Sequence, residues 1–186
     1  MLFRSNFSSH DLGIYSAGVQ IASVLTIVIM AVNTATVPHL YERLKSGRIT
    51  LANIHRLFWL SLLVPPALTA VVWVLPSSLM AWLLGADFAA SHYYMVIFVF
   101  AFSLIIPYLL LVNYLFYHAK NAQISLSSVL STVIYLLALW LFSQMSLTLV
   151  PWATIASSVA ILPLLYYFTL TVDQKLDQKV NKSGET

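Results

Sequence analysis

The sequence has no cysteine and very few charged residues. Without cysteine, the chain can form neither a disulfide framework nor a thiolate metal site, and thiols give no indication of its redox compartment. Charged residues make up 8% of the chain, whereas a soluble domain carries about a quarter. With 60% hydrophobic residues and a mean hydropathy of +0.87, the chain lacks enough polar surface to cover itself in water. The composition predicts an integral membrane protein.

The hydrophobic runs are continuous, which favours helices over a barrel. Barrel strands would alternate apolar and polar residues over about 10 positions, whereas these runs exceed the about 20 residues with which a helix crosses a ~30 Å hydrocarbon core. We expect an all-α bundle of five transmembrane helices within residues 1–172 and a cytoplasmic tail at 173–186. The expected spans are about 12–36, 57–84, 93–117, 124–142 and 149–172.

Lysine and arginine are unevenly divided between the connections. Eight of the nine fall after the first span, after the third span or in the tail, and only Arg4 falls on the other side. The eight are Arg43, Lys45, Arg48, Arg56, Lys120, Lys175, Lys179 and Lys182. Because these residues are retained in the cytoplasm when loops are short, the C-terminus is predicted to be cytoplasmic and the N-terminus outside.

Prolines interrupt several expected spans. Pro38 is expected to end the first, while Pro65 and Pro66, Pro107 and Pro163 lie inside the second, third and fifth. Each of these four removes a backbone donor and is a candidate for a helix kink. Transporters use broken helices to change conformation. A static kink that fits neighbouring helices explains each proline taken singly, since proline is common in membrane spans.

The polar side chains within the spans are uncharged. Gln20, Asn33 and Asn113 are candidates for the wall of a substrate cavity, where their amides would bind sugar or phosphate. The alternative role is an interhelical hydrogen bond worth about 0.6 kcal/mol. A proton- or cation-coupled carrier usually keeps an acidic or histidine side chain inside the bundle, and these spans contain none.

Arg43, Lys45 and Arg48 are expected to form a basic cytoplasmic loop after the first span. This loop would meet the phosphate of a lipid-linked substrate. Retention on the cytoplasmic side and attraction to anionic membrane lipid explain the same charges.

Small residues recur four positions apart, the spacing that lets membrane helices approach closely. The pairs are Gly18 with Ala22, Ser128 with Thr132, and Ala156 with Ala160. Chance explains any one pair equally well, because the pattern is common in membrane spans.

The sequence offers no residues for catalysis. It contains no nucleophile elbow, phosphate loop or paired carboxylates. The histidines fall at the ends of the expected spans or in loops, without the helical pairing that a metal site needs. We therefore expect no enzyme activity, no cofactor, no metal site and no nucleic-acid partner.

Three short motifs stand out at the ends of the expected spans. They are Leu12-Gly13-Ile14-Tyr15-Ser16, Leu84-Gly85-Ala86-Asp87-Phe88 with Ala89-Ala90-Ser91, and Ala153-Thr154-Ile155-Ala156. They resemble, in this order, the entry of the eighth helix, the turn after the ninth and the start of the twelfth in the polysaccharide (O-antigen) flippases of the multidrug, oligosaccharidyl-lipid and polysaccharide exporter superfamily. In this chain Leu149, Val150 and Pro151 replace the glycines that usually precede the last motif.

The resemblance implies a function and a larger architecture. Family members have about twelve spans in two six-helix lobes around a central cavity. The chain would supply helices eight to twelve, as the C-terminal part of a flippase lacking its N-terminal lobe. Its partners would be membrane lipid and undecaprenyl-diphosphate-linked oligosaccharide, which it would move across the bacterial inner membrane for surface polysaccharide synthesis.

Two other functions remain open at this point. One is a cation-coupled multidrug exporter of the same superfamily, which the absence of an intramembrane carboxylate disfavours. The other is a small structural subunit of a membrane complex.

Overall fold

The computed structural model describes the backbone of residues 8–184, and the side chains of that range except residue 83 and residues 173–184. The described residues form helices and connections, with no strand. The α-helices are α1 (Ser9–Lys45), α2 (Leu51–Ser61), α3 (Val64–Val74), α4 (Ser77–Leu84), α5 (Ser91–Ser103), α6 (Ile105–Tyr117), α7 (Asn121–Met145) and α8 (Val150–Gly184). Two short 3₁₀ helices, η2 (Ala86–Phe88) and η3 (Leu147–Leu149), complete the order.

Five stretches of this structure are long and apolar enough to cross a membrane. They are Ser9–Lys45, Leu51–Val74, Ser91–Tyr117, Asn121–Met145 and Leu147–Val172. The outer surface carries large apolar side chains such as Trp73, Val74 and Trp82, which are 70%, 76% and 80% exposed. Such a surface is stable against lipid and not against water. The expected all-α membrane bundle with five spans is confirmed.

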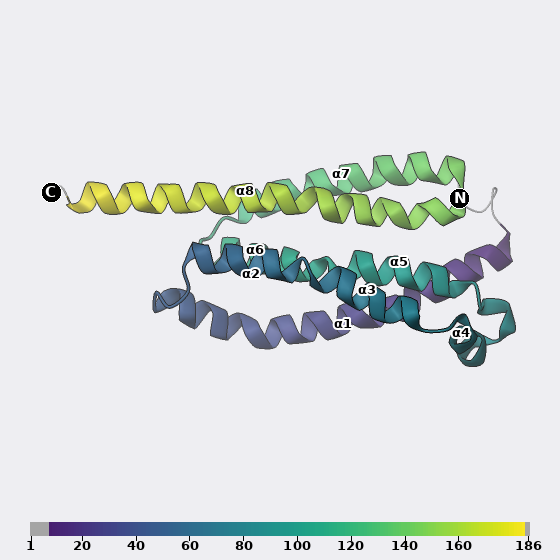
Figure 1. The fold of residues 1–186 in the computed structure, drawn as a ribbon. Helices are drawn as coiled ribbons and strands as arrows, with labels where there is room; N and C mark the ends of the chain where they lie inside the picture. Colours follow the sequence, from purple (N-terminus) through teal and green to yellow (C-terminus); the bar gives the residue numbers. More distant parts are fainter. Residues whose placement is uncertain (1–7, 185–186) are drawn as a thin grey trace.

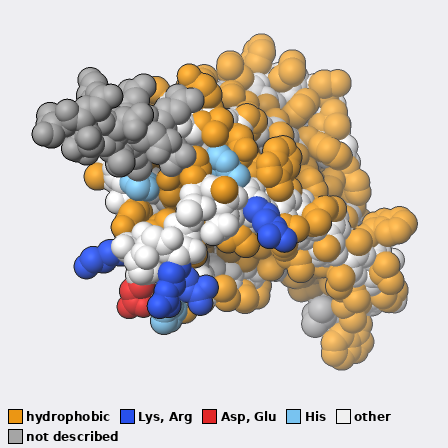
Figure 2. All heavy atoms as spheres, turned by 60° about the vertical axis from the view of Figure 1, so that its left-hand side comes forward, with side chains coloured by type: hydrophobic (Ala, Val, Ile, Leu, Met, Phe, Trp, Pro, Cys, Tyr) orange, Lys and Arg blue, Asp and Glu red, His pale blue; other side chains and the backbone are white. Residues whose placement is uncertain are grey.

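Successive spans run antiparallel, and the basic connections come together at one end (Figure 1). The α1–α2 and α6–α7 turns lie at that end with the C-terminus of α8, while α4 and the α7–α8 turn lie at the other. Figure 2 shows Lys and Arg side chains at the basic end, next to a largely hydrophobic surface. The unequal charge seen in the sequence is therefore an unequal charge between the two ends of the bundle.

Two clusters of buried side chains hold the bundle together. The first packs Ile54 of α2, Leu111 and Leu115 of α6 and Leu165 of α8, all essentially inaccessible. The second packs apolar side chains of α1, α4 and α5, among them Ile14, Ala22, Met80, Met95 and Phe98. The first cluster also contains Ile124 of α7, so the two clusters together include buried residues from all five spans.

The first helix does not end at Pro38, so that expectation is wrong. α1 continues through Pro38 to Lys45, because the proline removes only its own N–H and leaves the following turns able to bond. The helix ends at Lys45, and Gly47 two residues later has φ +70°. The amides of Gly47 and Arg48 donate to the carbonyls of Leu44 and Arg43 at 3.1 and 3.0 Å, the pattern of a Schellman turn.

The second span lies earlier in the sequence than the expected 57–84. Helical structure begins at Leu51, and the span ends at Val74. Leu75 is extended, with ψ 132°, as a residue before proline prefers. Pro76 has no N–H to offer the carbonyl of Val72, which lies 3.1 Å from Nε2 of His92 instead. The residues beyond Pro76 form α4, a separate helix.

The other expected boundaries differ by smaller amounts. Helical structure begins a few residues earlier than expected in the third and fourth spans, at Ser91 and Asn121, and the fourth extends to Met145. The backbone of the expected tail continues α8 as far as Gly184. Arg4 and the side chains of Lys175, Lys179 and Lys182 lie outside the described residues.

Candidate functional site

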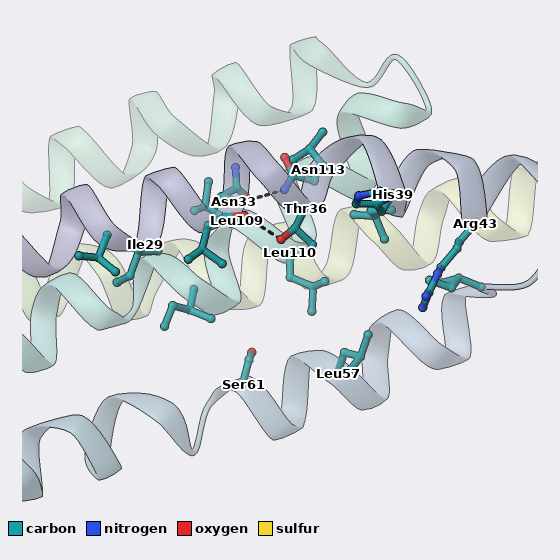
Figure 3. A pocket seen from close by; sticks show the side chains of 16 residues that line it. Ile29, Asn33, Thr36, His39, Arg43, Leu57, Ser61, Leu109, Leu110 and Asn113 are labelled. Atoms are coloured by element: carbon teal, nitrogen blue, oxygen red, sulfur yellow. Dashed lines mark hydrogen bonds between the residues drawn. The ribbon is translucent and has the colours of Figure 1, made fainter.

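A groove of about 700 Å³ runs between the C-terminal half of α1 and the facing surfaces of α2 and α6 (Figure 3). We call it the α1–α2 groove. Its volume falls within the roughly 300–1,000 Å³ typical of ligand pockets. Its walls are mainly apolar, and the residues that line it are Val28, Ile29, Val32, Asn33, Thr36, Val37, His39, Leu40, Arg43, Ile49, Leu57, Ser61, Ile106, Leu109, Leu110 and Asn113.

Two of the three amides predicted for a cavity meet in this groove. Nδ2 of Asn113 donates to Oδ1 of Asn33 at 2.8 Å, joining α6 to α1 (Figure 3). Asn113 is 9% exposed, so without a partner its amide would carry a desolvation cost. The third candidate, Gln20, is exposed on α1 and lines none of the cavities described here. The groove therefore has a hydrogen-bonded amide pair in a mainly apolar wall.

The expected basic loop is divided between a helix and a turn. Arg43 and Lys45 belong to the last turn of α1, and only Arg48 lies in the following turn. Arg43 lines the groove and extends from α1 towards α2 (Figure 3). Nδ1 of His39 lies 3.9 Å from Oε2 of Glu42 on the solvent-facing side. The groove thus has one permanently charged group, at its basic end.

A second cavity, of about 650 Å³, lies between α1, the α5–α6 junction, α7 and α8. Eight of its lining side chains carry hydroxyl groups, so we call it the hydroxyl cavity. They are Ser23, Thr26, Tyr108, Ser128, Ser131, Thr132, Thr154 and Ser158. Ser23, Ser131 and Thr132 donate to backbone carbonyls. The other five form no hydrogen bond with a described residue, and no acidic or basic side chain lines this cavity.

Each cavity adjoins a break in a helix that precedes a proline. The α2–α3 break at Leu62–Leu63 precedes Pro65 and Pro66 and follows Ser61, which lines the groove. The α5–α6 break falls at Leu104, which lines the hydroxyl cavity and precedes Pro107. Pro65 and Pro107 lack the N–H groups that would bond the carbonyls of Ser61 and Ser103. Ser61 lines the groove, whereas Ser103 is fully buried and lines neither cavity.

The fourth candidate kink does not break its helix. α8 continues without interruption through Pro163, which is exposed. Pro65 and Pro107, which follow the two breaks beside the cavities, are both fully buried, whereas Pro76 at the end of the second span is exposed.

One histidine has a structural role that the sequence did not indicate. His55 lies inside α2 and not at a helix end. Its Nε2 is 3.0 Å from Oγ1 of Thr169, and its ring lies 4.4 Å from that of Tyr166. Thr169 is fully buried, so this contact ties α2 to α8.

The chain matches two proteins of Haemophilus influenzae. One is named for the Lsg locus and is 40% identical over 170 residues, which cover 91% of this chain and 42% of that protein. The other is named an uncharacterised membrane protein and is 44% identical over 168 residues, covering 90% and 42%. This chain therefore spans less than half the length of these curated relatives. No family model and no solved structure matches it.

The fold and the name of the second relative both indicate a membrane protein. This chain is a membrane protein with five candidate transmembrane helices.

The hydroxyl cavity was missed by sequence reasoning, although a signal for it exists. Ser128, Ser131 and Thr132 share one face of α7 at helical spacing, and Thr154 and Ser158 do so on α8. The spacing of Ser128 and Thr132 is explained equally by close packing or by chance, and in the structure both residues line the cavity. The close contact is one residue away, where Oγ of Ser131 donates to the carbonyl of Ser157 at 3.1 Å.

Proposed function

We propose that this chain is part of a polysaccharide flippase that moves undecaprenyl-diphosphate-linked oligosaccharide across the bacterial inner membrane. The observation that carries the proposal is the hydroxyl cavity. A sugar presents many hydroxyl groups and no charge, so it needs a site with many neutral donors and acceptors. The five lining hydroxyls that form no hydrogen bond with a described residue meet that need.

The same cavity argues against the cation-coupled drug exporter. Moving a cation through a membrane usually requires an acidic or histidine side chain in the bundle. The five spans have no acidic residue between their end turns, and His55 of α2, which the structure places inside the second span, contacts Thr169 of α8 and lines neither cavity. Oligosaccharide needs no such group. Charged contacts to a diphosphate are left to the basic end of the bundle and to the part of the flippase outside this chain.

The proposal includes an orientation and a partner. With the basic end in the cytoplasm, the N-terminus of α1 and the α7–α8 turn face the periplasm. The relatives are more than twice as long as this chain. We assign the remaining length to a second lobe, against which these helices would rock as paired repeats do in transporters. No covalent chemistry is involved.

Complementation by the full-length gene tests the function. In a strain that lacks its O-antigen flippase, the wild-type gene should restore surface polysaccharide, and unchanged loss would contradict the proposal. The variant T26V/T154V removes two cavity hydroxyls without changing side-chain volume. At about 1 kcal/mol for each lost hydrogen bond, we expect roughly a tenfold or larger fall in the initial rate of polysaccharide export.

The matched control for this variant is Thr34→Val. Thr34 lies on α1, as Thr26 does, and is exposed. Its Oγ1 donates to the carbonyl of Met30 at 2.9 Å, and it lines neither cavity. Export by the control should stay within twofold of wild type when both proteins are expressed equally. Equal rates for T26V/T154V and T34V would remove the cavity from the mechanism.

A further inference from the structure

The α1–α2 groove combines a long apolar wall with a single cation at one end. We propose that it binds the polyprenyl chain of a lipid phosphate, with the phosphate at Arg43 and the hydrocarbon along α1 towards Ile29. This inference rests on the proposed function, because it assigns to this groove the lipid part of the same substrate. It concerns a lipid site on the flank of the bundle, separate from the hydroxyl cavity.

Arg43 is placed to receive a phosphate. It lines the groove and points across it towards α2 (Figure 3). Arg43 forms no ion pair with a described residue, because the nearby Glu42 faces His39. No acidic side chain lines the groove. An arginine fork binds phosphate oxygens in pairs, so the charge and the geometry both suit a phosphate at this position.

The depth of the groove fits a lipid that stands upright in the membrane. Arg43 lies on the last turn of α1, beside the turn that holds Arg48, at the basic end where headgroups are expected. From Arg43 to Ile29 the wall extends about 21 Å at 1.5 Å per residue. That length reaches past the middle of a ~30 Å hydrocarbon core. A long hydrocarbon chain would therefore stay in contact with the groove for most of its course.

The wall offers little to a polar ligand below the phosphate. Val28, Val32, Leu57, Leu109 and Leu110 supply most of the surface. The two amides at mid-depth, Asn33 and Asn113, already bond each other at 2.8 Å. An apolar chain can therefore pass over them without leaving a buried polar group that has lost its partner.

Charge complementarity separates a lipid phosphate from a protein segment. A phosphate supplies the anion that Arg43 lacks among the described residues, and no acidic side chain lines the groove. A single hydrocarbon chain is narrow enough to enter. We therefore choose the lipid over a segment of the flippase outside this chain, and the experiment below includes that segment as an outcome.

Photolabelling of the full-length protein in lipid nanodiscs tests the groove. The probe is a polyprenyl phosphate with a diazirine in its chain, next to phosphatidylethanolamine and phosphatidylglycerol. We expect label in the peptides of 28–43, 57–61 and 106–113. We expect R43Q to lower this labelling at least tenfold. K45Q removes the same charge from the same helical turn, but Lys45 does not line the groove, so labelling should change less than twofold.

A second pair of variants avoids reliance on charge. Val32 and Val24 both lie on α1 and are 61% and 57% exposed, but only Val32 lines the groove. V32W should block the groove and lower labelling at least fivefold, whereas V24W should leave it within twofold. Because both side chains are exposed, neither substitution disturbs a buried contact.

Competition identifies the occupant. Excess unlabelled polyprenyl phosphate should abolish the labelling, and the same amount of phosphatidylglycerol should not. Equal competition by phosphatidylglycerol would overturn the proposal in favour of an ordinary membrane lipid. An unlabelled groove would overturn it in favour of a protein segment that covers this surface. Equal loss in R43Q and K45Q would overturn the role of Arg43.

The outcome can be separated from that of the proposed function. Labelling measures lipid binding without transport, and complementation measures transport without reference to the groove. If the wild-type gene restores polysaccharide and the groove stays unlabelled, only the lipid site is wrong. If the groove is labelled as expected and the gene fails to complement, the flippase assignment is wrong.

Discussion

The two halves of α1 contact their neighbours in different ways. The N-terminal half lies directly on α5, where Ile14, Gly18 and Ala22 are buried. The C-terminal half stands away from α2 and borders the groove, and Val28 and Val32 remain 55% and 61% exposed. The same helix is thus a packing surface over its first turns and a cavity wall over its last.

Side-chain size explains this difference. A Cβ atom added at Gly18 would lie 2.6 Å from Cβ of Tyr94 and 2.9 Å from the carbonyl oxygen of Ser91. The α5 backbone approaches α1 this closely only because position 18 has no side chain. Further along, the side chains of Val32, Asn33 and Thr36 line the groove instead. A residue without a side chain thus permits the close contact in the N-terminal half of α1.

The largest expected effect comes from disrupting the contact between the N-terminal half of α1 and α5. G18V places a branched side chain against the α5 backbone, which cannot move aside as a flexible side chain could. We expect a loss of about 3 kcal/mol in unfolding free energy, measured by denaturant titration of the full-length protein in detergent. G13A is the control, because its Cβ would meet only Phe88 Cε1 at 3.9 Å. A loss in G13A as large as that in G18V would refute the close-contact explanation.

The next effect concerns the turn between α1 and α2, which follows the groove-lining half of α1. Gly47 has φ +70°, and Ala119 has φ 55° in the corresponding turn between α6 and α7. This conformation costs an L-residue about 1–2 kcal/mol. G47A should therefore lower the unfolding free energy by about 1 kcal/mol, and A119G should raise it by up to the same amount. Shifts of the same sign would show that backbone strain does not control these turns.

The smallest expected effect tests the hydrogen bond between Asn33 and Asn113 in the groove. N33A and N113A each remove one partner of the 2.8 Å hydrogen bond, and a double-mutant cycle should give a coupling of about 0.6 kcal/mol. Q20A is the control, since Gln20 is exposed on the same helix and should couple to neither. Zero coupling between Asn33 and Asn113 would mean that the bond does not contribute to the shape of the groove.

The sequence predicted the number of spans well and their ends less well. Hydropathy identifies which segments enter lipid, but a helix ends where its backbone bonds end. Pro38 left α1 intact because the helix lost only one bond, whereas Gly47 supplied the left-handed residue that stops it. Pro76 ended the second span because Leu75 before it is extended. These outcomes depend on the bonding of individual turns, which hydropathy does not report.

The candidate site was predicted only in part for a similar reason. Asn33 and Asn113 were selected as polar residues in apolar spans, but residues 80 positions apart are brought together only by the fold. The sequence predicts a loop that holds Arg43, Lys45 and Arg48 together. In the structure only Arg43 of these three lines the groove. The hydroxyl cavity combines side chains from four spans. Which helix faces meet is decided by packing across the bundle.

The helix breaks divide the bundle into stiff and jointed members. α1 and α8 continue through their prolines and α7 is also unbroken, whereas the second span is divided at Leu62–Leu63 and the third at Leu104. A rotation at either break would change the width of the adjoining cavity while the three unbroken helices kept their length and direction. The bundle therefore combines three continuous spans with two divided ones, with one division beside each cavity.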